Sequence, residues 1–241
     1  GVPSEGPMRI HKFLAQAGVC SRREAERLVA SGSVMINGKL AVTGQPVDPS
    51  VDTVICQGQH IKPLNRTVVL MMNKPRGYLC TNDDSHGGQT VFDMVPPEYG
   101  SLRLFCVGRL DKDSEGLLIL TNDGELANKV MHPSGGVIKR YEIVLNRDYD
   151  PTLTPRLLKG AVEEGEHLRF KKVIRHPDHA AHLEVHLDQG RKREIRRLFE
   201  IFGFHVKTLR RFQIGGLVLR KMPLGDCRPL SRKEIDSIFE N

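Results

Sequence analysis

The chain has 241 residues, enough for two modest domains that each bury a hydrophobic core. Lysine and arginine (36) outnumber aspartate and glutamate (29), and the net charge of +7 favours polyanionic partners. The 5 cysteines are scattered and form no CxxC pair, which disfavours a disulfide framework or a cysteine zinc site and favours a reducing cytoplasm. No apolar run approaches the roughly 20 residues of a membrane span, and residues 1–7 are expected to be a flexible lead-in.

The first sixty residues carry signals for a small α/β module. Apolar residues recur at helical spacing from Met8 to Gly18, so this stretch predicts a short helix that glycine ends. Ser21 and Glu24 form a capping box that opens a second helix. The dipeptide Asn37-Gly38 stands between two apolar runs and predicts a type I′ hairpin. Two helices and a small sheet are therefore expected.

Five cations lie on or beside these helices, off the apolar positions, where they could follow a phosphate backbone: Arg9, Lys12, Arg22, Arg23 and Arg27. Without further information, each is equally consistent with a solvated helix face. The stretch SRREAERLVASG followed by VMINGK resembles the alpha-L RNA-binding motif of the ribosomal S-four protein family. The resemblance implies an RNA-binding domain over residues 8–61, and the proline in 62–67 indicates a linker.

The remainder of the chain, residues 68–241, alternates apolar runs with polar turns. Strands are predicted at 68–72, 117–120, 140–145, 183–187 and 216–219. Helices are predicted near 125–131, 155–159 and 193–202. These helices are too few to alternate regularly with the strands, so the pattern favours an α+β fold with a mixed, mainly antiparallel sheet.

Four segments of this second region stand in a specific order: MNKPRGYLCT at 72–81, GRLDKDSEGLLILTNDG at 108–124, KRYEI at 139–143 and GRKREIRRLF at 190–199. Together they resemble the RsuA/RluB family of pseudouridine synthases. The resemblance implies an enzyme that isomerises a specific uridine to pseudouridine in ribosomal RNA, with large-subunit RNA preferred over small-subunit RNA. It also implies that neither a cofactor nor a metal is required.

The reaction detaches uracil from C1′ of its ribose, turns the ring and rejoins it through C5. It needs a carboxylate beside the anomeric carbon, a planar side chain to hold the free base and a cation that keeps the carboxylate ionised. The resemblance assigns these roles to Asp111, Tyr141 and Arg196. Judged by pattern alone, Tyr141 shares a strand face with Ile143 and Leu145 and is a core residue. Whether Asp111 attacks C1′ or removes a ribose proton stays open.

A stacked uridine hides both reacting carbons, so the target base must leave the stack. Further contacts to RNA are expected from five residues in or near the motifs: Arg109, Asn73, Lys74, Lys139 and Arg193. Lys74 could instead have a structural role. Arg109 is the candidate for displacing or holding the target nucleotide. Targets are therefore expected in loops, bulges and stem ends of ribosomal RNA.

Two rival functions come from other classes of protein. One is a catalytically silent ribosome-assembly factor that keeps the fold for RNA binding. The other is a magnesium-dependent nuclease built on four acids of one loop region: Asp111, Asp113, Glu115 and Asp123. The presence of all three expected catalytic residues disfavours the first, and the second would require Mg²⁺. A monomer is the simplest expectation for a chain with one cleft.

Histidines gather in one later segment and invite a zinc site: His176, His179, His182 and His186. However, His182, Glu184 and His186 alternate with three apolar residues, which is typical of a strand with one exposed and one buried face. The exposed strand face is the favoured interpretation, and no metal ligand is predicted.

Overall fold

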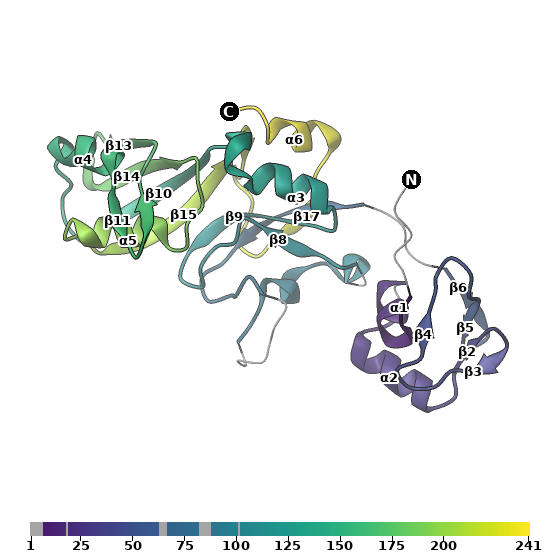
Figure 1. The fold of residues 1–241 in the computed structure, drawn as a ribbon. Coiled ribbons are helices and arrows are strands. Elements are labelled where there is room, and N and C mark those ends of the chain that lie inside the picture. The colour runs from purple at the N-terminus through teal and green to yellow at the C-terminus, as the bar shows by residue number, and fades with distance from the viewer. Residues whose placement is uncertain (1–6, 18, 63–66, 82–87, 101) are drawn as a thin grey trace. The chain divides into compact units, whose positions relative to one another are not determined.

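A computed structural model describes residues 7–17, 19–62, 67–81, 88–100 and 102–241 (Figure 1). The predicted helix end at Gly18, nearly all of the predicted lead-in and most of the predicted linker lie outside the described residues. The chain divides into two compact units, residues 1–67 with 95–104 and residues 68–94 with 105–241. In the described part of the chain, no helix is long and apolar enough to cross a membrane.

The first unit packs two helices against a small antiparallel sheet. The helices are α1 (Ile10–Gln16) and α2 (Arg22–Ala30). The four-stranded sheet has the order β3 (Lys39–Leu40), β2 (Val34–Ile36), β5 (Val54–Cys56) and β6 (Gln59–Ile61), beside the short pair β1 (Met8–Arg9) and β4 (Pro46–Val47). The apolar stripes of both helices meet the sheet in one core that includes Ile10, Leu14, Ala25 and Val29.

Local signals explain how this unit is built. The side chain of Ser21 accepts a hydrogen bond from the Glu24 N–H (3.1 Å) and begins α2, which is one half of the predicted capping box. The Glu24 carboxylate pairs with Arg27 on the next turn (3.4 Å). Asn37 and Gly38 have φ angles of 52° and 80°, which a type I′ turn requires.

The second unit is built on a nine-stranded sheet. Seven strands follow in the order β13 (Lys172–His176), β14 (His179–Leu187), β10 (Lys139–Leu145), β15 (Val206–Ile214), β9 (Glu115–Thr121), β7 (Val69–Lys74) and β17 (Cys227–Pro229); β16 (Leu217–Val218) pairs with β15, and β8 (Phe105–Val107) pairs with β9. Among these described strands, only β9 and β15 pair in parallel. The predicted α+β class with a mainly antiparallel sheet is confirmed.

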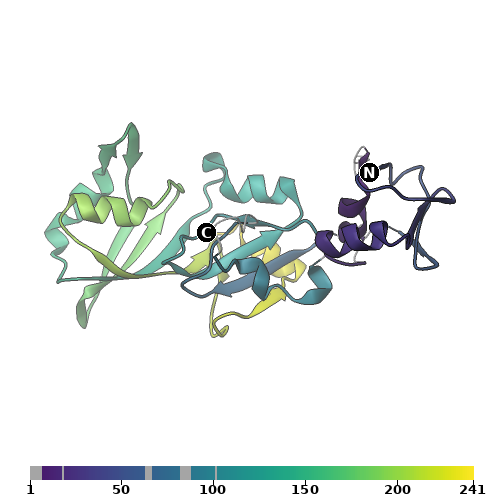
Figure 2. The same cartoon turned by 90° about the horizontal axis from the view of Figure 1, so that it is seen from below.

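Helices cover the two halves of this sheet. They are α3 (Gly124–Met131), α4 (Thr154–Lys159), α5 (Glu194–Ile201) and α6 (Arg232–Ser237). The unit also contains the 3-10 turns η1 (Val91–Met94), η3 (Pro133–Gly135) and η4 (Pro151–Leu153). A small hairpin is formed by β11 (Ala161–Glu163) and β12 (Glu166–Leu168). A further turn, η2 (Pro97–Tyr99), groups with the first unit. The α3 and α6 side chains share a core with Met71, Leu117 and Ile119. In Figure 2, α5 (yellow-green) lies across the other half of the sheet.

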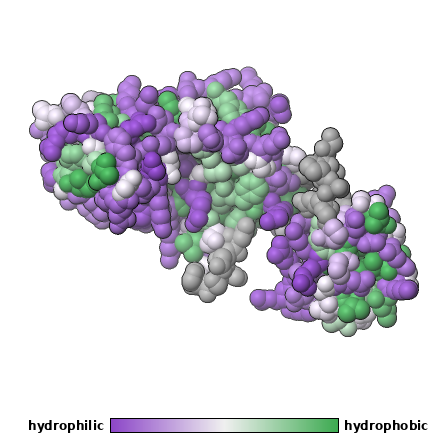
Figure 3. Space-filling view, in the orientation of Figure 1, coloured by the Kyte–Doolittle hydropathy of each residue, from purple (hydrophilic) through white to green (hydrophobic). Residues whose placement is uncertain are grey.

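The face of the second unit visible in Figure 3 is mainly hydrophilic. On β14, Leu183, Val185 and Leu187 are buried, as the alternation predicts, and His182 is exposed. His186 corrects the prediction, because it is only 6% exposed and its Nε2 atom lies 2.5 Å from Glu184 Oε2. Pairing with a neighbouring carboxylate explains how a polar ring is accommodated on the expected solvent face.

The central strand β15 is absent from the sequence-based prediction. Its sequence VKTLRRFQI carries three cations and buries residues at irregular intervals, including Arg211 at 2% exposure. A buried arginine breaks the apolar alternation on which strand prediction depends. The strands β8, β13 and β17 and the helix α6 were likewise not predicted, and the expected strand at 216–219 is reduced to Leu217–Val218.

Candidate active site

Asp111 lies half-buried in the loop that joins β8 to β9. The Ser114 N–H donates to the Asp111 carbonyl (3.0 Å) and closes a turn. Lys74, at the end of β7 and 0% exposed, donates from Nζ to the carbonyl oxygens of Ser114 (2.7 Å), Pro75 (3.0 Å) and Asp111 (3.1 Å). Burial lowers the pKa of Lys74, and the surrounding acidic groups oppose that shift. Lys74 therefore holds the backbone of the loop that presents Asp111.

A second buried cation holds both ends of the same loop. Arg211 on β15 donates from Nε to the Leu117 carbonyl (2.9 Å) and from Nη2 to the Gly108 carbonyl (2.7 Å). It lies opposite Gly116, where β9 and β15 run in parallel. Gly116 has a φ of 117°, and a Cβ atom there would stand 2.2 Å from the Arg211 carbonyl oxygen. Only glycine permits this close approach of the two strands.

Two arginines from the start of α5 face the carboxylates of the loop. Arg193 Nη1 lies 3.6 Å from Asp111 Oδ2, and the two Nη atoms of Arg193 donate to the Asp113 carboxylate at 3.1 and 3.3 Å. Arg196, 5% exposed, donates to the carbonyl oxygens of Val206 (3.1 Å) and Asp113 (3.2 Å), with its Nε 3.5 Å from Asp113 Oδ2. The structure thus places Arg196 on Asp113, which corrects the expected ion pair of Arg196 with Asp111.

Neighbouring charges and burial shift the pKa values of Asp113, Arg193 and Arg196 in different directions. Burial alone would raise the pKa of Asp113, but the hydrogen bonds from Arg193 and the charges of Arg196 and Arg193 outweigh burial and lower it. The Asp113 hydrogen bond raises the pKa of Arg193, whereas burial lowers the pKa of Arg196. Asp113 is therefore a fixed anion that both arginines share.

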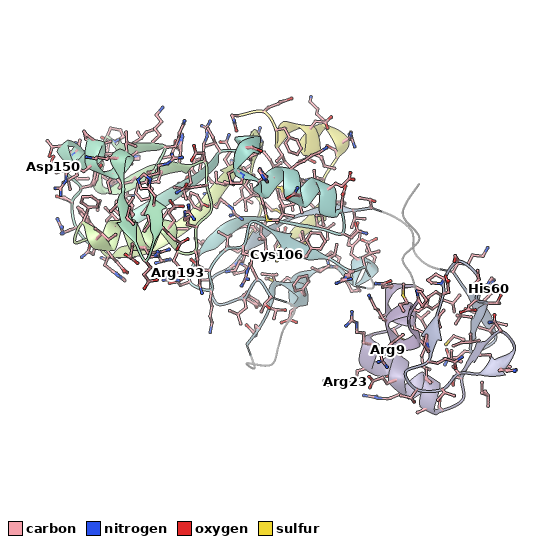
Figure 4. All side chains as sticks on the ribbon, viewed as in Figure 1. Arg9, Arg23, His60, Cys106, Asp150 and Arg193 are labelled. Carbon is pink, nitrogen blue, oxygen red and sulfur yellow. The ribbon has the colours of Figure 1, made fainter. Side chains whose placement is uncertain are left out.

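The turn before α5 fixes where Arg193 points. Arg193 adopts a φ of 52°, a left-handed conformation that is uncommon for residues other than glycine. The next residue, Glu194, is 2% exposed and accepts hydrogen bonds from the N–H groups of Arg169 (3.0 Å) and Arg191 (3.2 Å) and from the side-chain amide of Gln189. Arg193 lies where the α5 half of the unit meets the loops before β9 (Figure 4). A buried carboxylate thus holds the turn that presents this arginine.

Tyr141 and Lys139 lie on the neighbouring strand β10. Tyr141 is 8% exposed and pairs with Val185 and Arg211 on the two flanking strands, so Tyr141, Arg211 and Gly116 form one row across the sheet. Within the described residues, no hydrogen bond joins Tyr141 to Asp111. Lys139 is half-buried, and burial lowers its pKa.

The other expected RNA contacts separate into buried and exposed residues. Asn73 is 4% exposed and donates from its amide to the Met222 carbonyl (2.7 Å), so it braces a loop. Burial of Asn73 and Lys74 contradicts the expectation that these two side chains contact RNA directly, because neither reaches the surface. Arg109 is exposed, as a direct contact requires.

The cations predicted in the first unit are on its surface. Arg9, Arg22, Arg23 and Arg27 are exposed, and Lys12 is half-buried. Figure 4 labels Arg9 and Arg23 on the helical side of this unit. Their positions are compatible with contacts to an RNA backbone.

The described residues contain no group of three or more histidine, cysteine or acidic side chains that could hold a metal ion. The exposed rings of His176, His179 and His182 lie side by side at tilted angles, with centroids 5.0 Å and 4.9 Å apart along the row. Asp111 and Asp113, which the nuclease alternative requires as metal ligands, face arginines. This geometry gives the metal-dependent alternative no support.

Two side chains that build the site, Glu194 and Arg211, have no role in the sequence-based prediction, which names Asp113 only as a metal ligand of the nuclease alternative. Asp113 and Glu194 each adjoin or nearly adjoin an expected functional residue. Arg193, a partner of Asp113, lies 80 positions away, and the Glu194 partner Arg169 lies 25 positions away. Arg211 lies in the strand that was not predicted. The available signal for Asp113 and Glu194 was a charged residue inside a quoted motif, and Arg211 lies outside all four motifs.

The comparisons with known proteins agree with this architecture. The family model described as RNA pseudouridylate synthase matches residues 68–200, and the S4 domain model matches residues 8–52. A ribosomal large subunit pseudouridine synthase B from Vibrio cholerae is 37% identical, over 96% of this chain and 74% of that protein. The dual-specificity RNA pseudouridine synthase RluF from Escherichia coli is 35% identical, over 98% of this chain and 80% of that protein.

Solved structures give the same result. The chain matches a crystal structure of a pseudouridylate synthase with a TM-score of 0.66 and 25% identity, over 96% of this chain and 99% of that one. The resemblance to the RsuA/RluB family with a leading RNA-binding domain is confirmed. The chain belongs to the family of RNA pseudouridine synthases and carries an S4 domain ahead of its synthase region.

Proposed function

We propose that the protein isomerises a specific uridine to pseudouridine in ribosomal RNA, with the large subunit as the source of the target. The similarity to a ribosomal large subunit pseudouridine synthase B, 37% identical over 96% of this chain, carries this proposal. The same kind of enzyme, named from Pseudomonas aeruginosa, is 37% identical over 96% of this chain. The loop geometry around Asp111 supports the chemistry that these names imply.

Asp111 is the carboxylate that acts at the ribose. In one route it attacks C1′ as N1 of uracil leaves; in the other it removes a ribose proton as the glycosidic bond breaks. In the first route the bond from Asp111 to C1′ breaks as C5 of the turned base bonds to C1′, and in the second the removed proton returns to the ribose as that bond forms. In both, the C5 proton then leaves and N1 ends protonated, so atoms and electrons balance without an external reactant. Lys74 fixes the Asp111 backbone (3.1 Å), which leaves the half-buried carboxylate free to face substrate.

Arg193 is the cation that lies beside the Asp111 carboxylate. Arg196 does not contact Asp111 and acts indirectly, by holding Asp113. Arg193 spans both acids, at 3.6 Å from Asp111 and 3.1 Å from Asp113. Because Asp113 holds the shorter contacts, Arg193 offers Asp111 a neighbouring positive charge without masking it in a tight bidentate pair. Arg196 is buried and fixes Asp113. Together they keep a charged carboxylate directed at the ribose.

Tyr141 holds the free base. Its ring belongs to the row that includes Arg211 and Gly116, next to the loop held by Arg211. A flat ring with a polar tip is suited to stacking on uracil and to accepting or passing the C5 proton. The half-buried Lys139 and the exposed Arg109 would contact the flipped nucleotide and its phosphates.

The S4 domain supplies the remaining affinity for RNA. Its exposed arginines are suited to phosphate contacts, which bind RNA without reading its sequence. The target is expected to be a uridine in a loop, bulge or stem end, where displacing the base costs least. The enzyme would act as a monomer in the cytoplasm, where ribosomal subunits assemble.

The decisive experiment maps pseudouridine on unmodified ribosomal RNA and on ribosomal particles after incubation with the purified protein, without added metal or nucleotide. We expect modification at one uridine of large-subunit RNA, abolished in Asp111→Asn with RNA binding retained. Asp236→Asn makes the same chemical change at an exposed ion pair with Arg232 and should retain full activity.

The other outcomes separate the alternatives. Modification confined to small-subunit RNA would correct the target but keep the enzyme. Binding without modification of any substrate would favour a silent assembly factor. Cleavage of RNA in a parallel incubation with added Mg²⁺, and not in the incubation without it, would favour the nuclease.

A further inference from the structure

A turn shortly after β7 presents an arginine beside the candidate catalytic loop. Arg76 and Gly77 form this turn, and Gly77 has a φ of 94°, which glycine adopts readily. The Gly77 N–H donates to the carbonyl oxygen of Lys112 (2.8 Å), the residue that follows Asp111. The backbone of the Arg76 turn is therefore bound to the loop that carries the carboxylate.

The Arg76 side chain is exposed and extends to the first residues of β15. Its Nη2 atom donates to the Lys207 carbonyl oxygen in a long hydrogen bond of 3.5 Å. Arg196 donates to the carbonyl oxygen of the preceding residue, Val206, at 3.1 Å. Burial lowers the pKa of Arg196, and the positive charge of Arg76 adds to that shift. The two guanidinium groups thus bind successive carbonyl oxygens at one edge of the site.

Arg76 differs from the other arginines of the site in its partners. Arg193 and Arg196 face the Asp113 carboxylate, and Arg211 is buried against two carbonyl oxygens. In the described part of the chain, no carboxylate lies within ion-pair distance of Arg76. Its hydrogen bond to the backbone uses one of the five N–H donors of a guanidinium. The other donors and the positive charge are therefore available at the surface.

The charges of the site leave that of Arg76 in excess. Asp111 and Asp113 carry two negative charges, which the neighbouring Arg193 and Arg196 match. An exposed guanidinium added to such a neutral group is complementary to one further anion. A phosphate of RNA is such an anion, and two of its oxygens can accept short, charge-assisted hydrogen bonds from one guanidinium. Those bonds are stronger than the long bond to a neutral carbonyl oxygen.

We propose that Arg76 binds the RNA phosphate next to the target nucleotide. On binding, the exposed side chain rotates and exchanges the Lys207 carbonyl oxygen for phosphate oxygens. Because the Arg76 turn is bound to Lys112, the phosphate is held at a fixed position relative to Asp111. The contact sets the register of the RNA strand in the site and reads no base. This inference rests on the proposed function, which supplies the RNA, and adds a residue and a phosphate to it.

Equilibrium binding tests the contact without catalysis. Every protein is the full chain with Asp111→Asn, which leaves the RNA unmodified, and the probe is the shortest fragment of unmodified large-subunit ribosomal RNA that this parent chain binds. At a fixed low salt concentration, Arg76→Gln should raise Kd about tenfold, the effect of losing a charge-assisted hydrogen bond. The slope of log Kd against log salt should fall by about 0.7 to 0.9, because one phosphate fewer releases its counterions.

Two variants separate the charge of Arg76 from its place in the fold. Arg76→Lys keeps the positive charge, so it should keep the salt slope of the parent and recover part of the affinity, although an ammonium group cannot bind two oxygens as a fork. Arg232→Gln removes the same charge on α6, where the side chain is 86% exposed, and should leave Kd and slope unchanged. Equal salt slopes for Arg76→Gln and the parent chain would overturn the proposal, whatever happens to the affinity.

Neutral linkages locate the phosphate in the RNA. Single phosphates of the fragment are replaced by methylphosphonates, with a 2′-O-methyl ribose at that position for chemical stability, and the 2′-O-methyl phosphodiester is the matched control. One replacement should weaken binding of the parent chain about tenfold and have little effect on Arg76→Gln, as expected for a coupled pair. The coupled phosphate should adjoin the uridine that the active chain modifies. Coupling at a distant phosphate, or at none, would contradict the proposal.

Catalysis provides a second readout. With Asp111 restored, Arg76→Gln should raise the protein concentration at half-maximal single-turnover rate about tenfold and leave the saturating rate within about threefold of the wild type. A lower saturating rate at unchanged half-saturation would overturn the proposal, because Arg76 would then act on the chemistry. RNA that binds but is never modified refutes the proposed function, and the salt slope and the coupling still decide whether Arg76 binds a phosphate. Modification together with an unchanged salt slope refutes this inference alone.

Discussion

Two segments meet at the candidate site, and buried charges of opposite sign hold them. The loop that carries Asp111 has its carbonyl oxygens bound by two buried cations, Lys74 and Arg211. The turn that carries Arg193 has its N–H groups bound by a buried anion, Glu194. In each segment, the buried charge is opposite in sign to the charge presented at the site.

The opposite signs of the two buried charges follow from which backbone groups each irregular segment leaves without a partner. A loop without a ladder partner leaves either carbonyl or N–H groups unpaired, and burying them unpaired is costly. A cation satisfies several carbonyl oxygens at once and leaves a carboxylate to face the cleft, whereas an anion satisfies N–H groups and leaves an arginine. Both segments are therefore fixed before RNA binds, which is what a preorganised electrostatic site requires.

The largest effect is expected when the cation under the Asp111 loop is removed. Lys74→Met keeps the length of the side chain but leaves the carbonyl oxygens of Asp111 and Ser114 without their Nζ donor. At about 1–3 kcal/mol for each buried group left unpaired, the free energy of unfolding should fall by about 3 to 5 kcal/mol. Urea unfolding measures the loss, and pseudouridine formation should fall with it.

Lys112→Met provides the control, because this exposed lysine lies in the same loop and its side chain is not under the backbone. Its unfolding free energy should change by less than about 0.5 kcal/mol. Equal stability of the wild type and Lys74→Met would show that the buried cation does not hold the loop.

A smaller effect is expected when Glu194, the buried anion that binds the Arg193 turn, loses its charge. Glu194→Gln keeps the shape but replaces one carboxylate oxygen with an amide, whose N–H groups oppose those of Arg169 or Arg191. We expect a loss of about 2 kcal/mol in unfolding free energy. Activity should fall further than stability alone explains, because the left-handed backbone of Arg193 loses its support.

Glu200→Gln makes the same change on an exposed turn of the same helix and should leave both stability and rate near wild type. Stability is read from urea unfolding and rate from single-turnover pseudouridine formation. A Glu194→Gln variant with full activity would mean that Arg193 reaches the site without the buried anion.

Much of the fold was predictable because its signals are local. Asn37-Gly38 fixes a hairpin by its φ preferences, the Ser21 side chain caps a helix by accepting from the N–H three residues later, and the apolar run at β7 predicts a buried strand. Strand β15 was not predictable in this way, because its place in the middle of the sheet depends on Arg211 finding carbonyl acceptors on β9 and on the loop before it.

The site shows the same division between local and distant information. The motif around Asp111 marks the loop, but helical spacing alone cannot say which arginine of Arg193, Arg196 and Arg197 faces the carboxylates. The left-handed turn at Arg193 settles this by placing that residue outside the helix, beside Asp111. Arg197 instead binds Glu163 and Glu166 on the β11–β12 hairpin. These partners depend on tertiary contacts.

The smallest effect is expected where the two segments meet, at the exposed pair of Asp113 with Arg193. The folded pKa of Asp113 lies below its ordinary value of 3.8, so its charge stabilises the fold above that pH, and the contribution is lost as the pH falls through the folded pKa. Asp113→Asn should therefore be less stable than the wild type near neutral pH, and the difference should shrink in acid. It should stay below about 1 kcal/mol, because the Asp113 side chain is 44% exposed and solvent screens the pair. Urea unfolding at neutral and acidic pH measures both values. A difference that grows toward acidic pH would reverse the sign of this linkage and remove Asp113 as the shared anion of the two arginines.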